Sequence, residues 1–329
     1  MSIDRKRYTA ADEKEWDAFI EKNNRNATFL HSRQFFKHNP LNDADDASLL
    51  FYKKNKLKAV LPAALYPKEG NLIFHSHPRS TYGGFVMDLS AGVAEAMEIV
   101  EHTVAFAKEQ AAGEIIIRNP FRIFNQLPSD ETDYAMWYHG FTLKSREIES
   151  AIKLDEQAQS RYENGAKYNI KKAWKSVTVA ETPDYAAFWE MLTQNLQEKH
   201  GSKPTHSLEQ FQLLRQYCGD DNVKLFGGFI DGKLVCAVLI FVFGPQALHA
   251  QYIASDPAYQ DVRPLNAVID HVIQWGFKNG YSYFNLGTAN EDAGKTINHG
   301  LFHFKEGFGA RGILRETMHL KLNSAQDEK

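Results

Sequence analysis

The two halves of the chain repeat one order of expected helices and strands, and this repetition limits the fold more than any other feature. In the first half, a helix at 91–113 leads into the apolar strand EIIIRNP, which Pro120 ends. In the second half, a helix at 265–280 leads into the strand YSYFNLG. The closing strands, 139–154 and 307–322, correspond at an offset of about 168 residues. Self-similarity at this spacing predicts two copies of one α/β unit.

Local signals place further elements in each half. Thr9 and Asp12 form a cap pattern for an amphipathic helix, and Pro183 stands where proline is favoured, at a helix start. The segment 48–67 reads as two strands around a polar turn, and 223–243 as two strands around the tight turn Asp231-Gly232. We therefore predict an α/β (α+β) fold of two tandem domains, each a mixed sheet flanked by helices.

The expected domains are residues 1–154 and 182–329, joined by a basic helix at 155–181. Three lysines of this linking segment are spaced to share one helical face: Lys167, Lys171 and Lys175. One interpretation is a strip that binds phosphate or a nucleotide. The other is an ordinary solvated helix face, which is what most runs of charge are.

Composition excludes several classes of protein. The 329 residues carry a net charge of −3, so no overall basic field favours DNA as a partner. Cys218 and Cys236 are the two cysteines, far apart and without metal-like spacing, which is typical of a reducing compartment. The N-terminal residues lack the apolar stretch of a secretory signal, and no window approaches the roughly 18 apolar residues of a membrane span. We expect a cytoplasmic protein.

Two segments have the pattern of a ligand cleft. In LHAQYIASD (248–256), His249, Gln251 and Ile253 are expected on one face of a strand, and Leu248, Ala250, Tyr252 and Ala254 on the other. The corresponding segment of the first half, 74–86, contains Arg79 and Tyr82 just before the flexible pair Gly83-Gly84. The alternative is a pair of ordinary loop ends.

Metal and nucleotide-hydrolysis sites are not expected. His75 and His77 share a strand face and His299 and His303 are four apart, but neither pair has an evident third ligand. ANEDAGKT (289–296) has the spacing of a phosphate-binding loop, yet its acidic residues oppose phosphate, and the following INHGLFHF does not predict a clean helix start.

Five segments together resemble the Fem-type aminoacyltransferases and their GNAT-like acyltransferase relatives: the loop Tyr82-Gly83-Gly84, the basic helix NIKKAWK, the strand AQYIASD, the strand YFNLG and, above all, the late FKEGFG. The resemblance covers most of the chain and is strongest from about residue 160 onward. It implies two tandem GNAT-like domains that transfer an acyl group to an amine. In Fem-type enzymes the donor is aminoacyl-tRNA and the acceptor is a peptidoglycan precursor; in GNAT relatives the donor is acyl-CoA.

The resemblance also implies where the site lies. Phe304 and Lys305 match the catalytic cleft of the family, and a cation fixed in a dry site stabilises the oxyanion of acyl transfer. Glu291, Asp292 and His249 are candidate proton acceptors. Expected substrate-binding residues are Arg79, Tyr82, Gln251, Tyr252, Ser255 and Asn285. Expected donor-phosphate contacts are Lys167, Lys171, Lys175 and Arg263. The alternative for Lys305 is a surface lysine on a packed loop.

One departure from the GNAT pattern leaves the activity open. The glycine-rich loop that holds a pyrophosphate at a helix start corresponds here to YQDVRPLNAV (259–268), which has no glycine. Two hypotheses follow: an N-acyltransferase that uses acyl-CoA or aminoacyl-tRNA on a small-molecule or cell-envelope amine, or a non-catalytic ligand-binding relative. Acyl donor, acceptor, general base and oligomeric state are not specified by the residues.

Overall fold

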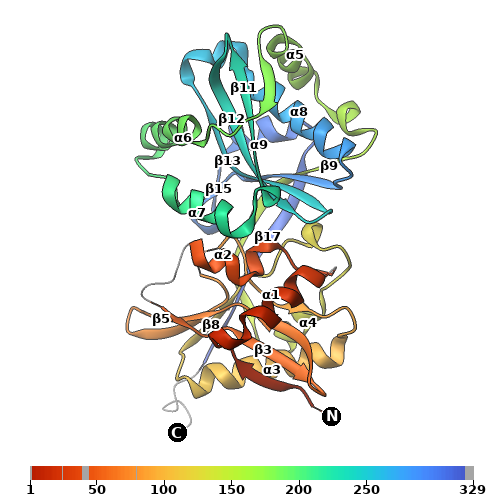
Figure 1. The fold of residues 1–329 in the computed structure, drawn as a ribbon, viewed down its shortest axis with the longest axis vertical. Coiled ribbons are helices and arrows are strands. Elements are labelled where there is room, and N and C mark those ends of the chain that lie inside the picture. Colours follow the sequence, from red (N-terminus) through yellow and green to blue (C-terminus); the bar gives the residue numbers. More distant parts are fainter. Residues whose placement is uncertain (1, 24, 39–43, 79, 323–329) are drawn as a thin grey trace. The chain divides into compact units, whose positions relative to one another are not determined.

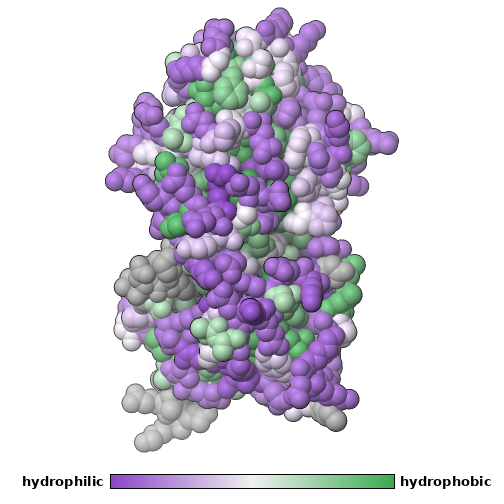
Figure 2. Space-filling model, viewed as in Figure 1, coloured by the Kyte–Doolittle hydropathy of each residue, from purple (hydrophilic) through white to green (hydrophobic). Residues whose placement is uncertain are grey.

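A computed structural model describes residues 2–23, 25–38, 44–78 and 80–322. The chain divides into two compact units (Figure 1), unit 1 with residues 1–146 and 315–329 and unit 2 with residues 147–314. In the described residues, no helix is long and apolar enough to cross a bilayer. On the face drawn in Figure 2, hydrophilic residues cover most of the surface and hydrophobic ones form scattered patches.

Unit 2 is built on a mixed sheet with strand order β10-β11-β12-β13-β14-β9. The strands are β9 (Thr142–Lys153), β10 (Thr178–Glu181), β11 (Val223–Ile230), β12 (Lys233–Phe243), β13 (Ala247–Ser255) and β14 (Tyr283–Thr288). Neighbours are antiparallel except β13 and β14, which pair in parallel. A parallel pair needs a long crossover, and α8 (Pro264–Lys278) supplies it.

Helices cover both faces of this sheet (Figure 1). α8 and α5 (Asn164–Ala173) lie on one face, and α6 (Tyr185–His200) and α7 (Leu208–Cys218) lie on the other. The apolar stripe of α8 packs on alternate residues of β12 and β13, among them Val238, Ile240 and Leu248. α9 (His299–Glu306) follows a two-stranded hairpin, β15 (Asn290–Glu291) and β16 (Thr296–Ile297). Asn298 caps α9, so the prediction of no clean helix start here is wrong.

Unit 1, like unit 2, consists of β-strands flanked by helices. Its strands are β1 (Asp4–Arg7), β2 (Asp45–Asp46), β3 (Leu49–Lys53), β4 (Lys56–Leu61), β5 (Ala64–Lys68), β6 (Asn71–His75), β7 (Val86–Met87), β8 (Glu114–Ile117) and β17 (Arg311–Lys321). Its helices are α1 (Glu13–Lys22), α2 (Arg33–His38), α3 (Val93–Glu109) and α4 (Glu131–Tyr138). The strands run in two series, β1-β3-β4-β7 and β17-β8-β6-β5-β2. The segment 48–67 thus supplies three strands, because β5 follows β4 after a short break.

Each unit takes its closing strand from the other half of the sequence. Residues 149–153 of β9 pair with β14 in unit 2, although β9 follows the first-half elements. Residues 318–321 of β17 pair with β8 in unit 1, although β17 ends the second half. The segment expected to link the domains, 155–181, lies within unit 2.

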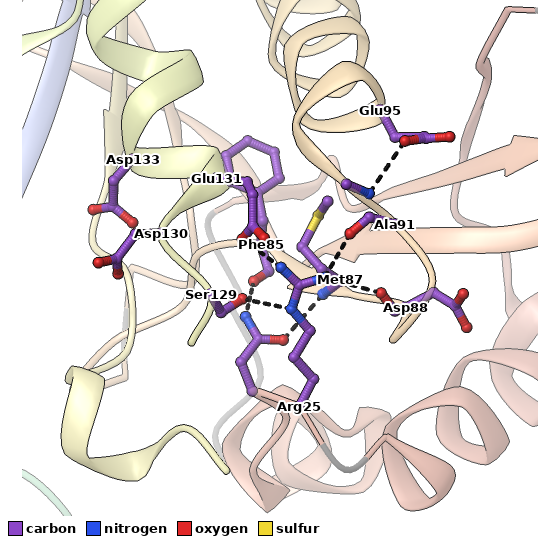
Figure 3. A network of polar contacts seen from close by, with 12 residues as sticks. Arg25, Phe85, Met87, Asp88, Ala91, Glu95, Ser129, Asp130, Glu131 and Asp133 are labelled. Atoms are coloured by element: carbon purple, nitrogen blue, oxygen red, sulfur yellow. Dashed lines mark hydrogen bonds and ion pairs between the residues drawn. The ribbon is translucent and has the colours of Figure 1, made fainter. Parts of the chain in front are cut away.

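A buried arginine, Arg25, connects the segment that precedes α3 to the start of α4 in unit 1 (Figure 3). The Arg25 guanidinium donates to the carbonyl oxygens of Asp88 and Ala91 and to the hydroxyl of Ser129, and it pairs with the Glu131 carboxylate. Arg25 is 4% exposed, so these partners offset the cost of burying its charge.

Candidate active site

Lys305 lies in the last turn of α9 in unit 2 and is 3% exposed. The helix ends immediately afterwards, and Gly309 has a φ of 77°, a left-handed conformation that favours glycine. An added Cβ at Gly309 would lie 2.8 Å from the Arg161 Cβ, so this turn also requires a close approach. Phe304 packs on the core of unit 2, with its ring 5.4 Å from that of Phe308. Neighbouring rings and a tight turn therefore hold Lys305 in place.

The Lys305 amine is bonded to the backbone of β14. Its Nζ donates to the carbonyl oxygen of Gly287 at 2.8 Å and to that of Thr288 at 2.7 Å. These two are its hydrogen-bond partners among the described residues, whereas an ammonium has three N–H donors. Burial lowers the pKa of Lys305 to about 8, and the negative charge of Glu149 opposes this decrease. The result is a sheltered cation with one N–H left for a ligand.

Asn285 joins this site to two neighbouring strands. Its Nδ2 donates to Glu149 Oε2 on β9 at 2.6 Å and lies 3.1 Å from His249 Nδ1 on β13. Its Oδ1 accepts the N–H of Gly287 at 3.0 Å. Gly287 has a φ of 75°, and the β9–β14 register shifts between Asn285 and Thr288. The amide of Asn285 thereby braces the irregular turn that presents two successive carbonyl oxygens to Lys305.

The pairing of β13 with β14 ends where two polar residues, His249 and Asn285, lie opposite each other. The parallel pairing joins 247–249 to 283–285 and ends at His249 and Asn285, although β13 continues to Ser255. Strands that stop pairing expose backbone N–H and C=O groups, which an extended ligand can use. The polar residues of β13 and β14 therefore lie where the sheet changes from paired strands to free edges.

A β-bulge in β13 changes which of its residues share a face, compared with the alternation expected from the sequence. Leu239 pairs with Tyr252 and Ile240 with Ala250, so the residue between them, Gln251, has no opposite partner on β12. The extra residue moves Tyr252 to the face of His249 and moves Ile253 to the opposite face, against the core of α8. Strict alternation cannot predict such a slip, because a bulge is set by the partner strand.

Side chains from α6 and from the loop before α7 pack against the second half of β13. The hydroxyl of Tyr252 lies 2.9 Å from Nδ1 of His206, and its ring meets Trp189 edge-on at 5.6 Å. Burial raises the pKa of Tyr252 and lowers that of His206, so both groups are favoured in their neutral forms. Ser255 donates its backbone N–H to Asn195 Oδ1 at 3.1 Å.

The expected donor-phosphate residues lie on exposed elements next to one another. Lys167 and Lys171 are exposed on α5, whose buried residues pack towards α8. Lys175 is also exposed but follows the end of the helix, in the turn after Trp174. Arg263 is exposed at the N-cap of α8 with a φ of 59°.

The remaining expected residues lie elsewhere. Glu291 and Asp292 are exposed in the β15–β16 hairpin, which occupies the ANEDAGKT segment. Tyr82 is inside unit 1, where its hydroxyl lies 2.8 Å from that of Thr28. Arg79 lies outside the described residues. Among the described residues, no group of three His, Cys, Asp or Glu side chains is arranged to hold a metal ion.

Sequence reasoning missed Glu149, which is 1% exposed and lies in the β9 segment IESAIKL. Little in the sequence signals it, because β9 is mostly polar and carries a second carboxylate, Glu147, two residues earlier. Its partner, Asn285, lies 136 residues away in the sequence.

The family comparison matches the segment that contains these residues. Residues 160–305 match the model described as the acetyltransferase (GNAT) domain. The matched segment is thus similar to a GNAT domain. It contains Asn285, His249 and Lys305, and Glu149 bonds to Asn285 from β9, just before the matched residues.

Solved structures extend the likeness to the whole chain. FemX is 15% identical, with a TM-score of 0.73 over 97% of this chain and 98% of that one. L-PGS from Bacillus licheniformis is 14% identical, with a TM-score of 0.58 over 93% and 90%. A tandem GNAT protein from the clavulanic acid biosynthesis pathway is 12% identical, with a TM-score of 0.52 over 98% and 100%. No curated protein matched in the sequence search. The expectation of a tandem GNAT-like fold is confirmed.

Proposed function

We propose that this protein is an N-acyltransferase in which Lys305 stabilises the oxyanion of the transfer. The observation that carries the proposal is the buried amine of Lys305, held by two carbonyl oxygens with one N–H to spare. A surface lysine on a packed loop would keep its amine in water. Burying an oriented cation lowers the stability of the fold. A protein that must stabilise negative charge developing on its substrate has a functional reason to keep such a cation.

In the proposed reaction, the neutral acceptor amine attacks the acyl carbonyl carbon and forms a C–N bond. The carbonyl π electrons move to oxygen, and the remaining N–H of Lys305 donates to this oxyanion. Collapse restores the carbonyl and breaks the bond to the leaving group, a CoA thiol or a ribose hydroxyl of tRNA. The leaving group gains the proton that the amine loses. His249, which contacts Asn285, is the candidate for assisting the proton transfer. Positioning of the two substrates supplies a further part of the rate.

We propose that the donor's phosphates bind at Lys167, Lys171, Lys175 and Arg263, which lie on adjacent exposed elements. The N-terminus of α8 begins with Pro264, which has no N–H, and its preceding loop has no glycine. It thus offers a pyrophosphate fewer backbone donors than a glycine-rich GNAT loop. This favours aminoacyl-tRNA over acyl-CoA as donor and, with the Fem-type resemblance, a cell-envelope precursor as acceptor. Gln251, Tyr252 and Ser255 are proposed to contact the acceptor or the acyl group.

The test is transfer by the full chain from acetyl-CoA, or from a pool of charged tRNA, to a nucleotide-linked muramyl pentapeptide. Lys305→Ala should lower kcat about 10²–10³-fold, the loss seen when one oxyanion donor is removed. The matched control is Lys278→Ala, an exposed lysine at the end of α8, which should retain wild-type kcat.

Full turnover by Lys305→Ala would rule out its assigned role. The non-catalytic alternative predicts a different outcome: calorimetry would detect binding of the muramyl peptide but of neither donor, and no transfer would occur with the wild-type chain.

A further inference from the structure

Glu149 is a buried carboxylate with no role in the transfer as described so far. It lies on β9, 1% exposed, and its Oε2 accepts a hydrogen bond of 2.6 Å from Asn285. Asn285 is 0% exposed and is fixed in turn by His249 and by the backbone N–H of Gly287. A carboxylate this deep in a protein is retained at a cost unless an opposite charge or hydrogen bonds compensate it.

The groups around the Lys305 amine include one charge that acts on it. β14 contributes neutral carbonyl oxygens, and β13 contributes His249, which reaches the site through Asn285. On α9 itself, the neighbouring titratable side chains His303 and Glu306 are exposed to solvent. In the hairpin before α9, Glu291, Asp292 and Lys295 are exposed as well. Glu149 lies opposite Thr288 in the β9–β14 register, and the Thr288 carbonyl oxygen accepts from the Lys305 amine at 2.7 Å. Among the described residues, its charge opposes the effect of burial on that amine.

We propose that Glu149 is a positioning residue for Lys305: held in place by Asn285, its carboxylate supplies the negative charge that keeps the buried amine a cation. This inference deepens the proposed function and rests on it for its catalytic meaning. Without the charge of Glu149, the buried amine of Lys305 would lose its proton more readily. The neutral amine would no longer stabilise an oxyanion as a cation does. The charge of Glu149 counters this, while the Lys305 amine donates hydrogen bonds to two backbone carbonyl oxygens.

The consequence for charge can be measured without catalysis. NMR of the full chain, with lysines labelled at the side-chain nitrogen, follows protonation of Lys305 directly, and Lys305→Arg identifies its signal. Burial places the Lys305 pKa at about 8. Glu149→Gln keeps an oxygen for Asn285 but removes the charge, and it should shift the Lys305 midpoint down by about one pH unit. Glu149→Asp, which keeps the charge, should shift it less.

An unchanged Lys305 midpoint in a folded Glu149→Gln protein would overturn the inference. If Glu149→Gln does not fold, the reciprocal measurement decides: in Lys305→Met, carbon NMR should show the Glu149 carboxyl titrating at higher pH than in the wild type. An identical Glu149 midpoint in the two proteins would equally overturn it.

These outcomes separate the inference from the proposed function. If the titrations couple but no donor supports transfer, Glu149 controls Lys305 and the acyltransferase proposal fails. If transfer occurs, the alkaline limb of kcat should move to lower pH in Glu149→Gln together with the Lys305 midpoint. A structural role alone would lower the melting temperature and leave that limb in place.

Discussion

At the scale of single residues, the chemistry of the site depends on removing one amine from water. Lys305 is flanked by Phe304 and Phe308, and its Nζ is bonded to two carbonyl oxygens of β14. Burial disfavours the charged form, so the Lys305 pKa decreases from its ordinary value to about 8. The amine thus changes charge close to neutral pH, where an exposed lysine would not.

This environment predicts the pH dependence of the proposed transfer. Lys305 is a cation below its pKa of about 8 and neutral above it, so kcat should fall as pH rises through about 8. The acceptor amine must be neutral to attack, so it produces a separate limb on which the rate rises with pH. Steady-state kinetics between pH 6 and 10 would check the alkaline limb.

Arginine at position 305 keeps its charge throughout this range. Any activity that Lys305→Arg retains should therefore lack the limb near pH 8. If the limb persists unchanged in that variant, it belongs to another group.

At the scale of elements, one buried carboxylate ties α5 to α8 and to the segment that precedes α5. Asp270 on α8 is 3% exposed. Its Oδ1 accepts from Gln159 and Tyr162, each at 3.1 Å, and its Oδ2 accepts from Trp174 at 3.0 Å and Gln274 at 2.8 Å. Four neutral donors compensate one charge, and they come from before α5, from its C-terminal end and from α8.

The same segment contacts the turn after Lys305. The ring of Tyr162 lies edge-on to that of Phe308 at 5.8 Å, and Glu163 donates its backbone N–H to the carbonyl oxygen of Gly307 at 2.9 Å. Asp270 therefore supports both the lysine-bearing helix α5 and the end of α9.

We expect Asp270→Leu to lower the free energy of unfolding by about 3 kcal/mol, because four hydrogen bonds to a charged acceptor are lost and the buried Tyr162 hydroxyl is left without its partner. Urea unfolding of the full chain measures this change. Hydrogen exchange should increase in α5 at the same time. Asp261→Asn, an exposed carboxylate before α8, is the control and should change stability by less than about 0.5 kcal/mol. Equal stabilities for Asp270→Leu and the control would show that the network does not hold α5.

At the scale of the whole molecule, the two halves of the sequence are not the two folded units. β9 closes the sheet of unit 2, and residues 318–321 of β17 pair with β8 of unit 1. Unit 1 is therefore complete only when the chain has been made to its last strand. The correspondence of 139–154 with 307–322 predicted both strands, but not that each pairs in the other unit.

Truncation after Leu314 should consequently affect the first unit, although the deleted residues are last in the sequence. β8 would keep β6 but lose its partner on the other side, and the core of unit 1 would lose Leu320 and Leu322. We expect amide protection in 114–117 to fall at least about tenfold by hydrogen exchange, while β12 in unit 2 keeps its protection. Truncation after Leu322, which spares β17, is the control. Loss of protection in β12 alone would contradict this assignment of strands.

The sequence by itself determined most of the elements and the place of Lys305. Helix caps, turn residues and apolar periodicity are local signals within a few residues, and they predicted α3, α8 and the β11–β12 hairpin. The tandem GNAT-like fold was predicted from the resemblance to a family. The same resemblance, through FKEGFG, singled out Lys305.

Tertiary structure alone decided what surrounds that lysine. Glu149, His249 and Asn285 lie on three strands, separated by up to 136 residues, and they meet because β9, β13 and β14 are neighbours. The bulge at Gln251 and the exchange of closing strands also depend on which strand lies alongside. Strand order and register are set by long-range packing, and no local stretch of residues encodes its own partner.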